Sequence, residues 1–275
     1  MNKKNNPLVS IILPTYNRSE YLSRAIESVL GQTYNNFELV IIDDCSTDRT
    51  SEIISKYQDS RIKIIKNKEN LGLVKSLNKA INYAKGECIA RIDDDDFWSD
   101  SKKIEKQIEF LENNPEYVLV GCGVIKINKQ GKEVRKYLFP EKDKEIREIM
   151  LVISPFVHPG VVFRKKAWEK VGGYDEKLYF SQDSDLWAKL GKIGKLYNIQ
   201  EYSVCVLDDN QNRTKKRVHY HLLLKQKIRL RHRRDYPHFL KAYLIGWGAY
   251  LFSFLPFQKK LKPLYFKLKQ LFLEN

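Results

Sequence analysis

The sequence has few cysteines and none of the spacings that bind a structural metal or build a disulfide framework. Four occur in 275 residues, they are dispersed, and no two form a C-x-x-C pair. Zinc ribbons and small disulfide scaffolds are therefore excluded. Free thiols in apolar runs behave as small hydrophobic groups, so we expect reduced cysteines and a cytoplasmic protein. They are Cys45, Cys88, Cys122 and Cys205.

Long apolar segments are scarce. Residues 1–7 lack the apolar core of a secretory signal, so we expect no secretory signal there. No segment reaches the roughly 20 apolar residues of a comfortable membrane span. Residues 242–258 come nearest, being uncharged and rich in aromatic and aliphatic side chains but broken by Pro256. Their length touches the lower limit of about 17 residues for a span, so the sequence leaves open whether they lie on a membrane or cross one.

Acidic residues are scarce at the end of the chain. The net charge is +15, and residues 210–275 carry +14 of it, because Asp235 and Glu274 are their only acids. Residues 1–209 are nearly neutral. This asymmetry predicts an anionic partner, either a membrane or a nucleic acid. No nucleic-acid recognition motif accompanies the charge, so we expect no nucleic acid.

Apolar runs alternate with helical patterns through the first half of the chain. Strand, helix, strand, helix at this spacing predicts an α/β fold with a doubly wound, mostly parallel sheet. A hairpin is expected after residue 127, where Asn128 and Gly131 mark a turn. The expected strands are 8–13, 37–42, 61–66, 88–92, 117–127, 161–163 and 196–199, and the expected helices are 19–31, 48–57, 73–84, 102–111 and 183–190.

Four consecutive aspartates, Asp93 to Asp96, follow the expected strand 88–92. Their carboxylates repel one another, and a solvated acidic turn would explain most isolated runs of this kind. Carboxylate oxygens are hard ligands that suit Mg²⁺ or Mn²⁺ and leave coordination positions for substrate phosphates. Open α/β sheets bind ligands at the carboxyl ends of their strands, so the placement favours a metal–phosphate site.

Polar loops follow two further strands at the same predicted sheet edge. One begins at Pro14 and contains Tyr16, and the other begins at Asp43 and Asp44. Taken alone, the second loop is as well explained as a capping turn. Because parallel strands end at one edge, we expect both loops to meet the Asp93–Asp96 segment there.

An ordered set of short motifs resembles family 2 glycosyltransferases over about residues 8–200. The resemblance implies a GT-A fold, a nucleotide-diphosphate sugar donor with UDP favoured, a divalent metal and inversion at the anomeric carbon. The motifs are VSIILPTYN at 9–17, SVLGQTY at 28–34, FELVIIDDCSTD at 37–48, NLG at 70–72, ARIDDDD at 90–96, GGYDE at 172–176 and QDSDLW at 182–187.

The resemblance also implies roles for individual residues. Asp95 would ligate Mn²⁺ or Mg²⁺, and Asp93 would bind the ribose or share the metal. Asp94 carries an extra charge where the family often has a small residue, and this leaves open whether Asp94 or Asp96 joins the ligands. The nucleotide-binding residues would be Pro14, Tyr16, Asp43, Asp44 and Asp93.

Asp183 falls where the family places its catalytic base, although it would also serve as a helix N-cap. Gln182 stands where the family usually has Glu, so the acid pair is halved. His158 lies in a stretch that lines the acceptor pocket in related enzymes, although a lone His before a strand is more often structural. We count Gln182, His158 and Trp187 as weaker acceptor-pocket residues, and Trp187 fits core packing as well.

The composition divides the chain into a glycosyltransferase domain, residues 1–212, and a basic amphipathic helical tail, residues 213–275. Lysines and aromatics around a short apolar segment favour a helix lying on an anionic membrane surface. A packed helical subdomain or a homo-oligomer contact is the alternative. The first interpretation predicts a peripheral protein on the inner face of the cell membrane.

Together these features predict a metal-dependent inverting glycosyltransferase acting on a glycan or lipid-linked acceptor in cell-surface polysaccharide biosynthesis. One alternative is a sugar-phosphate nucleotidyltransferase, which would normally carry a Gly-rich phosphate loop that residues 14–17 do not form. The other is a non-enzymatic basic module that binds lipid or nucleic acid, which would leave the acidic loops without a role.

Overall fold

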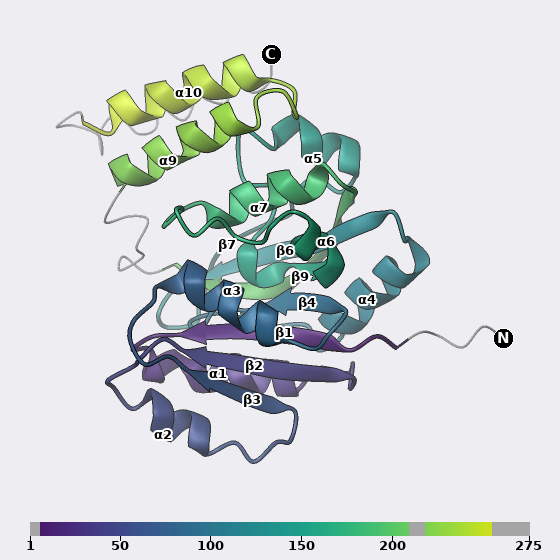
Figure 1. The fold of residues 1–275 in the computed structure, drawn as a ribbon, viewed down its shortest axis with the longest axis vertical. Coiled ribbons are helices and arrows are strands. Elements are labelled where there is room, and N and C mark those ends of the chain that lie inside the picture. Colours follow the sequence, from purple (N-terminus) through teal and green to yellow (C-terminus); the bar gives the residue numbers. More distant parts are fainter. Residues whose placement is uncertain (1–5, 209–217, 255–275) are drawn as a thin grey trace.

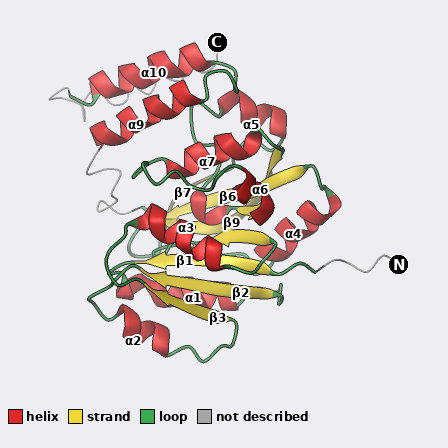
Figure 2. Ribbon diagram, in the orientation of Figure 1, coloured by secondary structure: helices red, strands yellow, loops and turns green. Residues whose placement is uncertain are grey.

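A computed structural model describes residues 6–208 and 218–254 as one sheet with helices on both faces (Figures 1 and 2). The strand order is β3-β2-β1-β4-β8-β6-β9-β5, with β7 paired to β6. The strands are β1 (Val9–Thr15), β2 (Phe37–Asp43), β3 (Ile62–Lys66), β4 (Cys88–Arg91), β5 (Phe97–Trp98), β6 (Tyr117–Ile127), β7 (Glu133–Tyr137), β8 (Val162–Arg164) and β9 (Lys195–Leu207).

The five expected helices are present, and their bounds lie close to the expected ones, but the helices at 143–149 and 165–170 were not expected. A short 3₁₀ helix, His158–Gly160, precedes β8. The helices are α1 (Ser19–Leu30), α2 (Thr50–Ser55), α3 (Leu73–Tyr83), α4 (Lys103–Asn113), α5 (Asp143–Ile149), α6 (Lys165–Lys170), α7 (Gln182–Gly191), α9 (Val218–Arg231) and α10 (Phe239–Phe252).

The central strands are unbroken apolar runs because both of their faces are buried. Along β1, Ile12 packs into the core layer under α3 and α7, whereas Ile11 and Leu13 pack into the layer under α1 and α4. Every residue of β1 and β2 is buried. Helices on both faces of a parallel sheet produce this pattern, and it confirms the predicted fold class.

The parallel registers bring three loops to one edge. Pro14 pairs with Ile42 across β1 and β2, and Ile12 pairs with Arg91 across β1 and β4. Three strands of the same direction therefore end together, and the segments that follow them lie side by side. Beyond β4 the direction changes, since β8 runs antiparallel to β4. The sheet is mixed but mostly parallel at the end that carries the site.

The described part of the tail is a helical hairpin that packs on the body. Arg229 of α9 is buried and donates to the main-chain oxygen of Leu151 (2.8 Å). Leu224 and Ile228 of the same helix form a small apolar cluster with body residues. The expected boundary between residues 212 and 213 and the last residues, 255–275, lie outside the described residues. Among the helices that the structure describes, none is long and apolar enough to cross a membrane.

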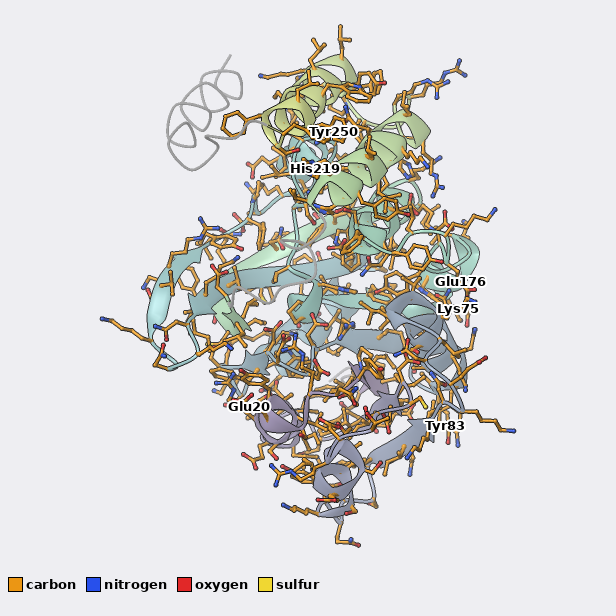
Figure 3. The ribbon with its side chains drawn as sticks, turned by 90° about the vertical axis from the view of Figure 1, so that its left-hand side faces the viewer. Glu20, Lys75, Tyr83, Glu176, His219 and Tyr250 are labelled. Carbon is orange, nitrogen blue, oxygen red and sulfur yellow. The ribbon has the colours of Figure 1, made fainter. Side chains whose placement is uncertain are left out.

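Figure 3 places His219 and Tyr250, one from each tail helix, together at one end of the molecule, whereas Glu20 of α1 lies near the other. The two tail helices are joined directly, because the Gln226 side chain donates to the main-chain oxygen of Tyr243 (2.9 Å). The hairpin is therefore a layer added over α7 and the loop after α5.

Candidate functional site

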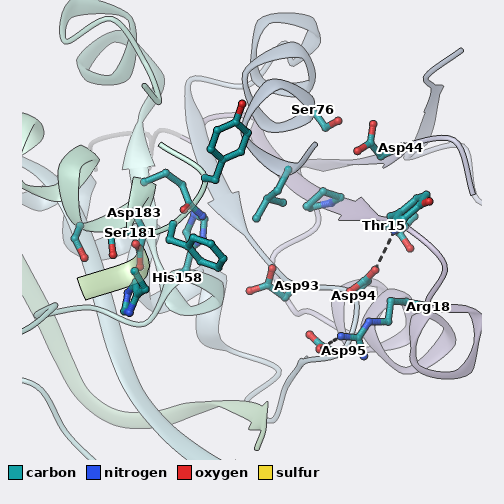
Figure 4. Close-up of a pocket in the computed structure, with 18 of the residues that line it drawn as sticks. Thr15, Arg18, Asp44, Ser76, Asp93, Asp94, Asp95, His158, Ser181 and Asp183 are labelled. Atoms are coloured by element: carbon teal, nitrogen blue, oxygen red, sulfur yellow. Dashed lines mark hydrogen bonds and ion pairs between the residues drawn. The ribbon is translucent and has the colours of Figure 1, made fainter. Parts of the chain in front are cut away.

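The three loops border one pocket of about 390 Å³, whose far wall is built by the start of α7 and by α9 (Figure 4). In Figure 4, Asp44 lies at one end, Asp183 and His158 at the other, and Asp93 to Asp95 between them. The predicted site residues that line it are Pro14, Tyr16, Asp44, Asp93, Asp95, His158, Gln182 and Asp183.

Asp44 occupies the end of the pocket next to β1. Its buried carboxylate accepts hydrogen bonds from the backbone N–H groups of Leu71 (2.8 Å) and Gly72 (2.9 Å). Gly72 has φ +83, a conformation that glycine adopts without strain. Asp44 thus fixes the loop before α3 as well as lining the pocket. The NLG motif is explained by this contact.

Asp43 is not among the pocket-lining residues. It ends β2 with its carboxylate buried, and one oxygen accepts a hydrogen bond from the backbone of Ser46 (2.8 Å). The nearest cation is Lys66, 4.0 Å from the other oxygen. The structure thus places Asp43 behind Asp44, where it supports the loop and does not face the pocket.

The acidic segment divides into residues that face the pocket and one that does not. Asp95 pairs with Arg18 (3.4 Å), and the backbone N–H of Tyr16 donates to Asp94 (3.4 Å). Asp96 points away, and its buried carboxylate accepts a hydrogen bond from the backbone of Leu207 (3.0 Å). Asp96 therefore ties the segment to β9 and is not among the pocket-lining residues, whereas Asp94 lines the pocket.

The charges of this segment are crowded. Burial, together with the neighbouring carboxylates of Asp95 and Asp93, raises the pKa of Asp94 to about 7. Burial alone would raise the pKa of Asp93, but Arg91, His158 and Arg18 together hold that pKa below its usual range. Closely spaced carboxylates of this kind destabilise one another unless a cation neutralises them.

The donor set fits the expected metal. Asp93 and Asp95 offer hard oxygen atoms on a rim that is open to the pocket. Within the described residues no group of three or more His, Cys, Asp or Glu side chains is arranged around one point. Two carboxylates fit Mg²⁺ or Mn²⁺ because such ions keep several positions for water and substrate phosphates.

Asp183 lies in the first turn of α7 at the other end of the pocket. Ser181, the residue before the helix, has φ +57, which is uncommon for a residue with a side chain. The chain turns sharply there, and Gln182 and Asp183 both line the pocket. The carboxylate is half-buried and faces the space that the acidic segment borders.

His158 lines the same end and is held by a tyrosine. Its Nε2 lies 2.7 Å from the hydroxyl of Tyr174. Burial and the charge of Arg91 lower the pKa of His158 to about 4, so the ring is neutral near pH 7. Trp187 lies beneath it, fully buried in edge contact with the His158 ring. Trp187 therefore belongs to the core and not to the pocket wall.

Several pocket residues lie outside the motifs. Arg18 follows the first loop directly, and its place next to the 9–17 motif was the available signal. Tyr179 reaches the pocket from the loop before α7 and is 71% exposed. His221 and Lys225 of α9 also line it. No sequence signal placed these two there, because the segment before α9 separates them from the motifs.

A buried carboxylate attaches α9 to the helix that carries Asp183. Asp185 of α7 has no exposed surface and lies 2.9 Å from Arg231 and 3.0 Å from His232. Lys189 lies 3.5 Å from its second oxygen. Burial alone would raise the pKa of Asp185, but these three partners hold it below its usual range. The wall formed by α9 is thus fixed to α7 two residues from Asp183.

Known proteins match both the sequence and the fold. The family described as Glycosyl transferase family 2 matches residues 10–172. An uncharacterized glycosyltransferase of Methanocaldococcus jannaschii is 35% identical over 90% of this chain and 89% of its own. The chondroitin synthase of Pasteurella multocida is 31% identical over 71% of this chain and 20% of its own.

Two solved structures share the fold at 20% sequence identity. S. aureus TarS 1–349, in complex with UDP-GlcNAc, superposes with a TM-score of 0.69 over 94% of this chain and 78% of its own. The mannosyltransferase PcManGT of Pyrobaculum calidifontis, with GDP-Man and Mn²⁺, gives 0.64 over 93% and 72%. The predicted GT-A fold is confirmed.

Proposed function

The chain belongs to glycosyltransferase family 2, and we propose that it transfers a sugar from a UDP-sugar, with inversion, to a hydroxyl of a glycan or lipid-linked acceptor. The family match sets aside the nucleotidyltransferase and the non-enzymatic module. One observation carries the proposal: Asp44, the Asp93–Asp95 segment and Asp183 border a single pocket.

The donor would lie along the pocket with its base beside Asp44. Pro14 and Tyr16 line that end, where the Tyr16 ring and the Asp44 carboxylate offer an apolar face and a hydrogen-bond acceptor to a nucleobase. UDP is favoured by the S. aureus complex with UDP-GlcNAc, whereas the P. calidifontis complex contains GDP-Man. The diphosphate would then reach the acidic segment.

Asp93 and Asp95 would hold Mg²⁺ or Mn²⁺ at the centre of the pocket. The ion would supply Lewis-acid stabilisation of the charge that develops on the departing diphosphate. Arg18 pairs with Asp95, which orients that carboxylate. The P. calidifontis neighbour was solved with Mn²⁺, and this supports the choice of ion.

Asp183 would act as the general base. It takes the proton from the acceptor hydroxyl as that oxygen attacks the sugar from the face opposite the diphosphate. The Gln182 side chain beside it offers a hydrogen-bond donor and an acceptor without adding charge. The neutral His158 ring, held by Tyr174, lines the acceptor side with these residues.

The acceptor is proposed to be a growing surface polysaccharide or its lipid-linked precursor. The similarity to a chondroitin synthase supports a glycan acceptor. The basic tail supports a peripheral position on the inner face of the cell membrane, where a lipid-linked acceptor would be available.

Donor hydrolysis in the presence of Mn²⁺, measured with a panel of UDP-sugars, tests these roles. Asp183→Asn should lower kcat by about 10²–10⁴-fold, the range typical of general-base catalysis, while UDP binding stays unchanged. Asp95→Asn should raise the Mn²⁺ concentration needed for half-maximal activity. Asp59→Asn is the matched control, since Asp59 lies outside the pocket and pairs with Arg61 at the surface. Full activity of Asp183→Asn would disprove the assignment.

A further inference from the structure

The outer face of α10 exposes large apolar side chains that nothing in the described structure covers. Leu240, Leu244 and Leu251 are 66%, 57% and 65% exposed, and Phe254 just after the helix is 56% exposed. The leucines are spaced by four and seven residues, which places them on one side of a helix. Contiguous exposed apolar surface of this kind marks an interaction site.

The opposite face of α10 is committed to the protein. Gly246 lies against α9, where a Cβ atom would collide with the side chains of Arg229 and Gln226. Ala242 is fully buried in the core layer over α7. The orientation of the helix is therefore fixed, and the leucine face has to point outward. In Figure 1, α10 is the outermost element at this end of the molecule.

The described tail that carries this face is strongly basic. Residues 218–254 contain seven Lys and Arg and a single acid, Asp235, which is bonded to Lys192 and His232. The structure divides the seven. Arg229 and Arg231 bind the body and Lys225 lines the pocket. The other four do not: Lys227, Arg233 and Arg234 are exposed, and Lys241 is half-buried beside Leu240.

We propose that the Leu240–Leu244–Leu251 face of α10 docks on a membrane surface that contains anionic lipid, with the helix lying in the plane of the interface. The apolar face of α10 and the exposed basic side chains of α9 and the following turn supply the two attractions that hold a protein on an anionic membrane surface, namely burial of apolar area and charge. Basic residues near an anionic leaflet are attracted to it, and the attraction falls off within a Debye length. Among the described residues, no helix is long and apolar enough to cross a membrane.

Docking would bring the pocket close to the bilayer. α9 lies between α10 and the pocket, and its His221 and Lys225 form part of the pocket wall. An acceptor attached to a lipid would then reach Asp183 without leaving the membrane. This consequence rests on the proposed transferase activity, whereas the docking, which deepens the proposed peripheral position, does not depend on that activity.

Flotation of the full-length protein tests the docking. Vesicles of phosphatidylcholine alone are compared with vesicles that also contain phosphatidylglycerol. Unaltered protein should float with the second kind and remain at the bottom with the first. The triple variant Leu240→Gln, Leu244→Gln, Leu251→Gln should lower the bound fraction at least about tenfold. The variant Lys227→Glu with Arg234→Glu should float no better with the vesicles that contain phosphatidylglycerol than with those of phosphatidylcholine alone.

The matched control is Ile64→Gln with Val134→Gln, since both side chains are 56% exposed but lie on β3 and β7. This control should float as the unaltered protein does. Equal flotation of the triple variant would overturn the proposal. A dimer of the unaltered protein that the triple substitution dissociates would also overturn it, because another copy would then cover the face. So would a loss of thermal stability in the triple variant without loss of flotation, because another part of the chain would then cover the face. UDP binding is measured on every variant, so that failure of docking and failure of the proposed function are told apart.

Discussion

The four adjacent aspartates show that identical side chains in sequence have different tasks in space. Asp95 faces the pocket and pairs with Arg18, while Asp96 is buried and bonded to the backbone of Leu207. The run alone predicts a cation site at this edge, and the pocket lining agrees with that. It does not indicate which oxygens are free for a ligand, because this depends on β9, more than a hundred residues later.

Substitutions of this segment should therefore separate by residue. Asp96→Asn should keep donor hydrolysis within about threefold, because the amide oxygen still accepts the Leu207 hydrogen bond and no buried charge remains. Asp96→Ala should lower stability by about 1–3 kcal/mol, since it leaves that N–H buried without a partner. Urea unfolding and Mn²⁺ titrations of activity measure both. A large rise in the Mn²⁺ requirement of Asp96→Asn would return Asp96 to the ligand set.

Asp94 should behave in an intermediate way. Its pKa is raised to about 7 by burial and by its acidic neighbours, so Asp94→Asn relieves repulsion while keeping an acceptor for the Tyr16 N–H. For Asp94→Asn we expect a stability equal to or higher than that of the unaltered protein, and a loss of activity of about tenfold or less. Asp95→Asn should lose more activity than this. Stability and hydrolysis measured on the two variants side by side decide this. Equal loss in both would make Asp94 a metal ligand.

At the scale of elements, α7 has two tasks within one turn. Asp183 faces the pocket, and Asp185 binds Arg231 and His232 of the following helical layer. Side chains two positions apart point to different sides of a helix. The wall that contains His221 and Lys225 is thus held in place from the same turn that carries the proposed base.

Asp185→Asn should loosen α9. Removing one partner of a buried ion pair costs about 3–5 kcal/mol, but Arg231 is 45% exposed and keeps Asp175, so we expect about 1–3 kcal/mol. Hydrogen exchange should increase in 218–231, with urea unfolding as the second measure. Asp59→Asn, which removes a surface pair, should cost about 0–1 kcal/mol. Unchanged exchange in α9 would contradict the anchoring role.

The same contact predicts a pH dependence. The folded-state pKa of Asp185 is lowered, so its contribution to stability is present above the unfolded value of about 3.9. That contribution is lost as the pH falls below this value and through the folded-state pKa. The free energy of unfolding is measured over about two pH units on either side of 3.9. As the pH falls, it should decrease less steeply for Asp185→Asn than for the unaltered protein. Parallel curves would mean that other carboxylates cause the acid sensitivity.

At the scale of the whole molecule, the sequence predicted the sheet end well and the tail incompletely. Loops after β1, β2 and β4 were predictable because parallel strands must end at one edge. The tail looked like a separate basic segment because composition carries no information on which side of a helix is covered. In the structure Arg229 is buried against Leu151 and Lys225 lines the pocket. Charge that seemed free for a membrane is partly used within the fold.

A ligand that spans the pocket should stabilise the whole chain, because the pocket joins the sheet edge, α7 and α9. At 100 times its Kd, a nucleotide bound only by the folded state adds about 2.7 kcal/mol, which corresponds to a rise in Tm of about 5 °C for a chain of this size. We expect that rise for UDP with Mn²⁺, a smaller one for UDP alone and none for AMP. A nucleotide panel in a thermal-shift assay measures this. Asp59→Asn should keep the rise, and Asp95→Asn should lose only the part that Mn²⁺ adds. Equal shifts with every nucleotide, or none with any, would mean that the pocket does not select a nucleoside diphosphate.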